Sequence, residues 1–454
     1  MAGFGGSASS GTWGTRFGFL MAAIGSSVGL GNFWRFPYTA GENGGAAFVL
    51  IYLVCVVLIA FPILIAELSV GRHARRSAVG SVRKMAFDAG SSEMWSIAGW
   101  VGMAGGVMIL CFYSVVAGWV AAYVWKMFTG SLVGADAQAV SDTFSALLAD
   151  TGAVIGWHSL FMVITIGIVS LGVTKGIEKA VTILMPLFFL MLVGMVVYAG
   201  IAGDMGAAVT YLFAVDFSEV TPATVLAALG QAFFSIGVGS AIMITYGSYL
   251  PKSDNLPQSA TIIAGADTMV AIIAGLAIFP FVFAFTALDP NAGPALFFQA
   301  LPAAFAQMPG GQYVGAAFFA LAFIAALTSS ISLLQVIVAF GEEHTDFGRL
   351  GSAFFFGAII WLVGVGAAYS GDFFDLLDLI SGRILLPLGG LLIAVFTGWV
   401  VSRALMQKEL PHAGNAMFNY WRFAIRYPVP IAVAAIIVAG LATTFGVDLP
   451  FIGG

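Results

Sequence analysis

Long apolar stretches, separated by short polar segments, run through almost the whole chain. A helix that crosses a bilayer needs about 20 mostly apolar residues, and eleven segments between charges and turn signals approach or exceed that length. The predicted spans cover residues 14–40, 44–71, 94–126, 157–172, 177–203, 222–250, 258–287, 310–341, 350–371, 374–403 and 427–447. The pattern therefore predicts an all-α polytopic membrane protein with 11 transmembrane helices.

Three segments between these spans do not fit a crossing helix. Residues 130–155 are predicted to form an external loop, and residues 404–426 an internal one. The stretch from Asp289 to Glu342 carries no charge between its ends, but it is too long for one span and prolines interrupt it. We therefore expect residues 294–308 to form a short helix that lies over the outer face.

The basic residues are distributed unevenly between the two sides of the membrane. Of the 17 lysine and arginine residues, 14 fall in segments on the same side as the N-terminus. Cytoplasmic loops carry an excess of lysine and arginine. The N-terminus is therefore predicted to be cytoplasmic and, with eleven spans, the C-terminus external, as expected for a multi-pass protein of a bacterial plasma membrane.

The first predicted span is interrupted near its middle by the residues GSSVGLGN, positions 25–32, followed by FWRFP. A helix in hydrocarbon must satisfy its own backbone hydrogen bonds, and irregular backbone at that depth occurs only where it is enclosed by protein or lines a cavity. This break therefore marks a candidate binding site.

A second break, SIGVGSA at positions 235–241, interrupts the sixth span. Small residues also permit close helix packing, but two broken helices at corresponding places in inverted halves are typical of secondary transporters. Helix ends within the membrane expose carbonyls that attract cations and amides that attract carboxylates. A zwitterionic amino acid carries both kinds of charge, and hard Na⁺ ions prefer oxygen ligands.

Several motifs resemble the neurotransmitter:sodium symporter family. They are WGTR at 13–16, the break with FWRFP, ENGG at 42–45, Glu67, GR at 71–72, KGIEK at 175–179, GQAFFS at 230–235 and LTSS at 327–330. The resemblance is strongest to the family's bacterial eleven-helix amino-acid transporters. It implies one transporter domain over residues 1–454, built from inverted repeats at 13–205 and 219–405 (five helices each, with helices 1 and 6 unwound) and an extra helix at 426–447.

The resemblance also implies ligand-binding residues. One sodium site would use Gly25, Val28, Ala325, Thr328 and Ser329, and a second would use Ser27, Asn32, Ser235, Asp267 and the substrate carboxylate. The substrate pocket would be lined by Ser26, Leu30, Gly31, Ile109, Tyr113, Phe234, Gly237, Ser240, Ser329 and Leu333. Arg35 and Asp378 would form the outer gate, and Trp13, Tyr249 and Glu343 would belong to the inner gate.

Several positions bear on ion coupling, on the choice of substrate and on the inner gate. Asp267 supplies a fixed carboxylate, which predicts transport that does not require chloride. Ser240 and Gly237 enlarge the pocket and favour a large, aromatic or hydroxyl-seeking side chain. Ser10 stands where the inner gate of relatives has an arginine. Either Glu343 pairs with another cation, for which Lys252 near Tyr249 is the candidate, or the inner gate is weak.

Two alternatives to import of a neutral amino acid remain open, namely transport of a substrate with an anionic side group and substrate sensing without transport, and enzymatic activity is excluded. Arg383 either pairs with Asp375 or Asp378 or contacts an anionic or carbonyl group of the substrate. A substrate-sensing receptor could use the same scaffold without transport. An intramembrane enzyme is excluded because the sequence offers no nucleophile–base or metal-binding constellation, and nothing in it indicates a nucleic-acid partner or an obligate protein partner.

Overall fold

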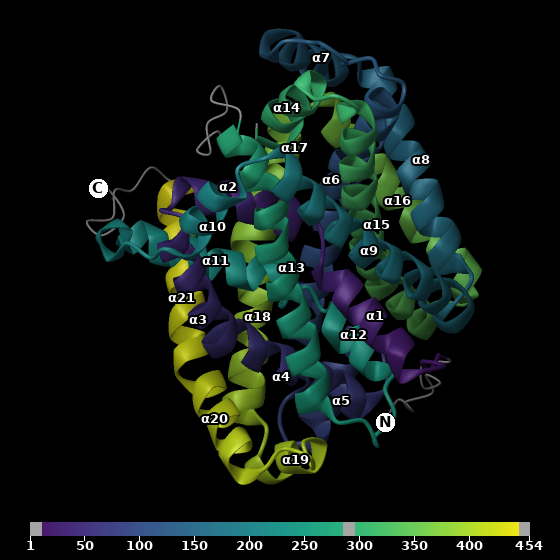
Figure 1. The fold of residues 1–454 in the computed structure, drawn as a ribbon. Helices are drawn as coiled ribbons and strands as arrows, with labels where there is room; N and C mark the ends of the chain where they lie inside the picture. Colours follow the sequence, from purple (N-terminus) through teal and green to yellow (C-terminus); the bar gives the residue numbers. More distant parts are fainter. Residues whose placement is uncertain (1–10, 285–295, 445–454) are drawn as a thin grey trace.

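The protein is all-helical throughout the part that the computed structural model describes, residues 11–284 and 296–444 (Figure 1). In these ranges nine helical segments are long and apolar enough to cross a membrane, and a tenth crossing consists of two helices that meet at 48°. The predicted membrane protein with many spans is therefore confirmed.

In the first half of the chain the spans follow the predicted order. The elements are α1 (Arg16–Ser27), η1 (Gly31–Arg35) and α2 (Phe36–Glu42) for the bent crossing; α3 (Ala46–Cys55), η2 (Val56–Ala60) and α4 (Phe61–Ala74); α5 (Ala78–Asp88), η3 (Glu93–Ser96) and α6 (Ile97–Phe128); α7 (Ala137–Ala149) and α8 (Thr151–Ser170); and η4 (Val173–Glu178) and α9 (Lys179–Ala202). The elements η1, η2 and η4 are π-helical turns within longer helices.

The second half begins with short helices and continues with long ones. Its elements are α10 (Met205–Phe213), η5 (Phe217–Glu219), α11 (Pro222–Ile236), α12 (Ile242–Ser248), α13 (Leu256–Ala284), η6 (Leu296–Ala300), α14 (Leu301–Gln307), α15 (Gly311–His344), α16 (Gly348–Tyr369), α17 (Gly371–Asp378), η7 (Leu379–Leu385), α18 (Leu386–Val395), η8 (Phe396–Val400), α19 (Arg403–Glu409), α20 (Asn415–Arg426) and α21 (Pro428–Thr444). Because α11 and α12 have only 15 and 7 residues, the eleventh crossing stays a prediction.

Two of the predicted loops are wrong. The expected external loop at 130–155 contains α7, and α8 starts at Thr151. The side chains of Asp136 and Asp150 accept hydrogen bonds from backbone amides of these two helices and so start both of them. The expected internal loop at 404–426 contains α19 and α20, and buried Phe418 and Trp421 anchor α20 to the bundle.

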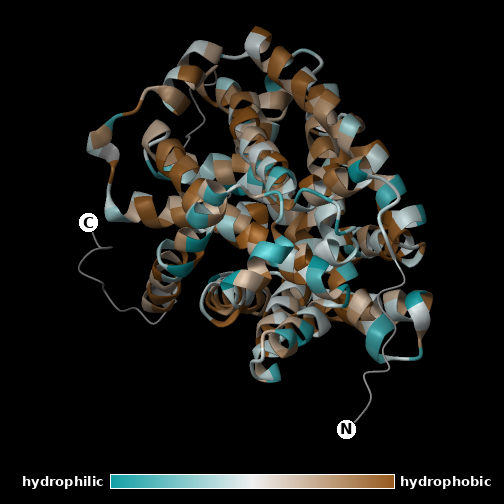
Figure 2. Cartoon of the chain, turned by 90° about the horizontal axis from the view of Figure 1, so that it is seen from below, coloured by the Kyte–Doolittle hydropathy of each residue, from teal (hydrophilic) through white to brown (hydrophobic). Residues whose placement is uncertain are grey.

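The most enclosed helix, α15, lies at the centre of the bundle. It packs against α1, α6, α8, α9 and α16. The two broken spans meet beside it, because α1 contacts both α11 and α12 and η1 contacts α11. Hydrophobic residues are prominent on the surrounding helices (Figure 2), as expected for surfaces that face lipid. The breaks are thereby enclosed by protein.

Candidate functional site

The break in the first span lies where the sequence predicts it. Helix α1 ends at Ser27, and Val28 leaves the helical conformation with φ −73° and ψ 99° before η1 begins at Gly31. The hydroxyl of Ser27 donates at 3.2 Å to the carbonyl of Ile236, the last residue of α11. The irregular backbone of one broken span is therefore bonded to the end of the other.

The second break depends on left-handed backbone conformations. Gly237, Gly239 and Ala241 have φ values of 71°, 87° and 63°, and a Cβ added at Gly239 would lie 2.2 Å from the Leu386 carbonyl oxygen. Glu67 Oε1 accepts a hydrogen bond from the Gly239 amide at 2.7 Å. Glu67 therefore supports the broken backbone of the sixth span from a neighbouring helix.

A small cavity of about 60 Å³ lies between the two breaks. All ten residues predicted to contact substrate line it, together with Ser27, Gly29, Ser235, Ile242 and Leu386. No charged side chain is among the described residues of this lining. The structure thus brings the ten predicted residues together, while their contact with a substrate stays a prediction.

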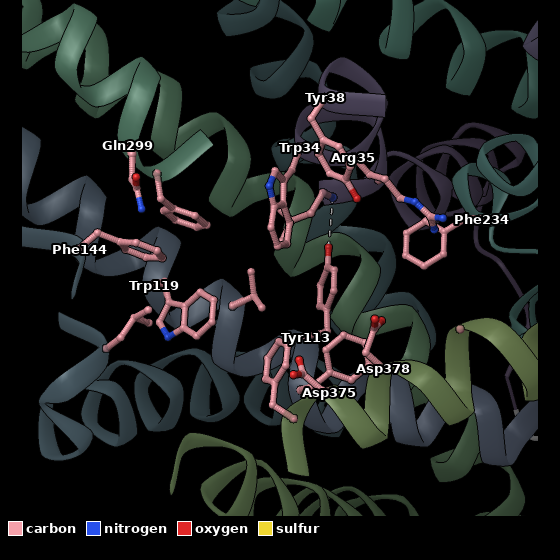
Figure 3. A pocket seen from close by; sticks show the side chains of 18 of the residues that line it. Trp34, Arg35, Tyr38, Tyr113, Trp119, Phe144, Phe234, Gln299, Asp375 and Asp378 are labelled. Carbon is pink, nitrogen blue, oxygen red and sulfur yellow. Dashed lines mark hydrogen bonds between the residues drawn. The ribbon is translucent and has the colours of Figure 1, made fainter. Parts of the chain in front are cut away.

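The lining of this cavity contains a few hydrogen-bonding groups. The Leu30 amide donates to the Tyr113 hydroxyl at 3.3 Å (Figure 3). The Ser26 hydroxyl is buried, lines the cavity and has no partner in the described protein. The Ser240 hydroxyl donates to the Gly237 carbonyl at 2.5 Å and can still accept a hydrogen bond. The cavity is therefore apolar with a few hydroxyls.

The first group of predicted sodium ligands gathers where α1 ends against α15. The Ser329 hydroxyl lies 3.4 Å from the Gly25 carbonyl oxygen and 3.2 Å from that of Ala325. The Thr328 hydroxyl lies 3.0 Å from the same Ala325 oxygen. Val28 follows directly on the end of α1. A set of neutral carbonyl and hydroxyl oxygens suits a hard cation rather than a transition metal.

The second group forms a buried network around a carboxylate. Asp267 Oδ1 accepts a hydrogen bond from the side-chain nitrogen Nδ2 of Asn32 at 2.9 Å, and Oδ2 accepts one from the Ser235 hydroxyl at 2.7 Å. The Asn32 side-chain oxygen accepts from the Gly29 amide at 3.1 Å. Asn32 and Asp267 are completely buried. The described residues contain no cluster of three His, Cys, Asp or Glu side chains that would indicate a different metal.

Above the small cavity lies a vestibule of about 580 Å³, lined by Arg35, Asp375, Asp378, Arg383 and many aromatic side chains. The Arg35 guanidinium carbon lies 4.4 Å from the centre of the Phe234 ring, and Asp378 lies apart from it (Figure 3). No ion pair joins Arg35 to Asp378 among the described residues. The two predicted gate residues thus share the vestibule without closing it.

The opposite end of the site is sealed by aromatic residues. Trp13 Nε1 donates to the Tyr246 carbonyl at 3.1 Å, and its ring packs perpendicular to the Tyr246 ring with centres 5.1 Å apart. Tyr249 packs on the same indole, with ring centres 6.1 Å apart. All three are buried. Trp13 and Tyr249 therefore lie together, while their role as a gate stays a prediction.

The predicted cation for Glu343 is wrong. Glu343 accepts from the Ser77 amide at 2.8 Å and pairs with Arg76 at 3.5 Å, whereas the charge of Lys252 acts on Glu409. Ser77 caps α5, so the acid is drawn to the positive end of that helix. Ser10 lies outside the described residues.

Sequence reasoning missed a residue near Trp13, at the aromatic end of the site. Both carboxylate oxygens of Glu178 are bonded to the segment before α1: the amides of Gly14 and Thr15 donate at 2.7 and 3.0 Å, and the Thr15 hydroxyl donates at 2.8 Å. Glu178 is the glutamate of the KGIEK motif, but nothing in the sequence indicates that it contacts residues 14 and 15, which lie more than 160 positions earlier.

Comparison with known proteins gives a consistent result. Residues 10–143 and 138–448 match the sodium:neurotransmitter symporter family. An uncharacterized sodium-dependent transporter of Bacillus subtilis, YhdH, is 36% identical over 93% of this chain and 95% of its own length. An uncharacterized sodium-dependent transporter of Haemophilus influenzae is 33% identical over 95% of this chain and 98% of its own length. The crystal structure of MhsT in complex with L-phenylalanine matches with a TM-score of 0.86 and 40% identity, covering 95% of this chain and 99% of MhsT.

Proposed function

This chain belongs to the sodium:neurotransmitter symporter family, and we propose that it imports a neutral hydrophobic or aromatic amino acid together with sodium, independently of chloride. It is a sodium-dependent transporter that crosses the membrane many times. The observation that carries the proposal is the cavity between two broken helices, which is lined by uncharged residues and flanked by two groups of oxygen atoms. Transport would proceed by alternating access around this fixed site.

The cavity supports a substrate with a free carboxylate. The Leu30 amide and the Tyr113 hydroxyl lie together at one wall, and amides at a helix start favour an anion. The carbonyls at the end of α1 lie on the other side of the same break and favour a cation. An α-amino acid carries a carboxylate and an ammonium group on one carbon atom, so its main chain would bridge the break.

The lining supports an uncharged side chain on the substrate. Burial of an unpaired charge in an apolar site is costly, and no charged residue lines the inner cavity within the described part of the chain. The hydroxyls of Ser26 and Ser240 face the same space, which favours a large side chain that tolerates or uses a hydroxyl partner. Arg383 lines the vestibule and not this cavity, so a substrate with an anionic side group is the weaker alternative. The complex of MhsT with L-phenylalanine supports the same class of substrate.

Two Na⁺ ions would bind beside the substrate. Neutral oxygens of Gly25, Val28, Ala325, Thr328 and Ser329 would hold one, and Ser27, Asn32, Ser235 and Asp267 would hold the other. In the second group the buried Asp267 carboxylate supplies a permanent negative charge next to the bound cation, so no chloride ion would be needed to balance it.

The distribution of basic residues supports a cytoplasmic N-terminus in a bacterial inner membrane, with the C-terminus outside. In this orientation the vestibule faces outward, and the Trp13 seal faces the cytoplasm.

The test is uptake into proteoliposomes across a panel of labelled amino acids. We expect uptake of neutral, large substrates that requires an inward sodium gradient and persists when gluconate replaces chloride. Binding without any uptake would support a sensing receptor instead. Preferential uptake of acidic amino acids, lost in an Arg383→Asn variant, would support the anionic alternative, and uptake that stops without chloride would overturn the role given to Asp267.

A further inference from the structure

Two arginines tie α20 to the end of the preceding span. Arg422 donates from Nη1 to the Thr397 carbonyl at 2.8 Å and from Nη2 to the Val401 carbonyl at 3.1 Å. Arg426 donates from Nε to the Gly398 carbonyl at 2.6 Å. Thr397 and Gly398 belong to η8 and Val401 is its C-cap residue, so no further helical amide follows to bond these carbonyls. These contacts of Arg422 and Arg426 are therefore explained by capping of the helix end.

A third arginine, Arg403, starts the next helix and faces the same corner. Its Nη2 donates to the Asn419 side-chain oxygen at 2.8 Å, and its guanidinium lies 5.4 Å from the centre of the Phe418 ring. The charges of Arg403 and Arg426 both act unfavourably on Arg422. No acidic side chain forms an ion pair with any of the three in the described part of the chain. Three positive charges thus share one corner without a carboxylate.

Capping does not account for the remaining donors of Arg403 and Arg426. Arg426 bonds the protein through Nε alone, which leaves both of its terminal nitrogens without an acceptor among the described residues. Arg403 uses only Nη2 and is exposed. The planar guanidinium group matches the oxygen geometry of a phosphate. Both side chains are therefore equipped for an anion that the described protein does not supply.

The surroundings of the cluster are those of a lipid surface. Phe423, Tyr427 and Ile431 follow one another at intervals of four residues, and all three are exposed, Ile431 by 71%. Trp399 is exposed by 53% and lies under the Arg426 guanidinium at 5.1 Å. Tryptophan and tyrosine gather where a membrane meets water, and α20 and α21 lie along one edge of the molecule (Figure 1). An apolar stripe therefore leads from the arginines toward the centre of the membrane.

We propose that Arg403 and Arg426 bind the headgroup phosphate of an anionic phospholipid in the cytoplasmic leaflet, with its acyl chains along Phe423, Tyr427 and Ile431. Basic pockets next to a membrane span on the cytoplasmic side are suited to anionic headgroups. Arg422 is buried and positions α20 against η8. The site is distinct from the substrate cavity, so its occupation is measured without any transport assay, and it depends only on the proposed orientation.

The experiment is lipid binding to the purified full-length transporter in detergent, followed by native mass spectrometry and by thermal melting. Phosphatidylglycerol is titrated against phosphatidylcholine, and inorganic phosphate is titrated separately. The test variant is Arg403→Gln/Arg426→Gln. The matched control, Arg83→Gln/Lys84→Gln, removes two partly exposed positive charges from α5, at a different place on the same predicted side.

We expect phosphatidylglycerol to bind the wild type and the control more tightly than phosphatidylcholine does, and to raise their melting temperature. The test variant should bind it about thirtyfold more weakly, because each cation near an anionic surface contributes about fivefold. Equal loss in both variants would overturn the assignment to this corner. An equal rise in melting temperature with inorganic phosphate would overturn the assignment of the ligand as a phospholipid. Retained sodium-dependent substrate binding in the test variant shows that it is folded.

Discussion

The contact between Glu178 and the segment before α1 gives the sharpest test of how the inner end of the site is held shut. In the variant Glu178→Gln, one carboxylate oxygen becomes an NH₂ group that cannot accept. At least one of the three donors on Gly14 and Thr15 then loses its acceptor, and the others bond a neutral oxygen. The side chain is 6% exposed, so water replaces the lost acceptor poorly.

The expected cost follows from the strength of hydrogen bonds to charged groups. Each contributes about 1.5–3 kcal/mol, so losing one and weakening the others costs about 3 kcal/mol in the closed arrangement. A conformation in which the segment before α1 has moved away from Glu178 at the end of η4 does not contain these hydrogen bonds and is not penalised. Its population relative to the closed form should rise roughly a hundredfold, because 1.4 kcal/mol corresponds to a factor of ten.

The assay is a distance measurement between spin labels on cysteines introduced at Thr12 and Asp346, two exposed positions on this side of the molecule. In the presence of sodium, the labelled protein that carries no further substitution should give one short distance between the two spin labels. Glu178→Gln should add a longer one and slow uptake, and the control Glu93→Gln, which makes the same chemical change on an exposed side chain, should add none. An unchanged distance distribution in Glu178→Gln, with and without sodium, would refute the reasoning.

For three further substitutions, the structure predicts whether transport or stability rises or falls. Replacing Asp267 with Ser removes the fixed negative charge of the second sodium group, so uptake should become dependent on chloride, as measured by exchange for gluconate. Ser240→Phe adds a ring to a cavity of about 60 Å³, so uptake of large substrates should fall more than tenfold while that of alanine persists in the same competition assay. Burial raises the pKa of Glu409, but the hydrogen bond from His73 and the charges of His73 and Arg72 outweigh it and hold that pKa below its ordinary value. Because the folded-state pKa is lowered, this stabilisation is present above the ordinary carboxylate pKa and is lost as the pH falls through the lowered one. Glu409→Gln should therefore flatten the acid side of the curve of melting temperature against pH, and an unchanged slope there would contradict this.

The breaks in the helices were predictable because their cause is local. Glycine permits positive φ, as at Gly237 and Gly239, and hydrocarbon tolerates no irregular backbone that protein does not enclose. A run of glycine and serine inside an apolar span is therefore enough to indicate a cavity. The clustering of Asn32, Ser235 and Asp267 was not predictable in this way. It came from the family resemblance, since these residues lie on three different helices.

The errors arose where a contact depends on tertiary packing. Glu343 was expected to seek a cation near Tyr249, yet the start of α5 brings the Ser77 amide and Arg76 to it. Residues 404–426 look polar enough for a loop because charged residues are spread along them. They form α20 because its apolar face, with Phe418 and Trp421, is buried against the bundle.

The two ends of the site are held by different kinds of contact, and this difference bears on how binding can drive transport. In the proposed orientation, the inner end is closed by neutral aromatic packing around Trp13 and by the hydrogen bonds that the Gly14 and Thr15 amides donate to Glu178. The outer end is open, with Arg35 resting on Phe234 instead of pairing with Asp378. A ligand can shift a conformational equilibrium only by its differential affinity for the two states. Since the predicted ligands bridge α1 to α11 and α15, binding would draw the outer halves together. An Arg35–Asp378 pair formed in that closure would then help to offset the few kcal/mol that releasing Glu178 costs.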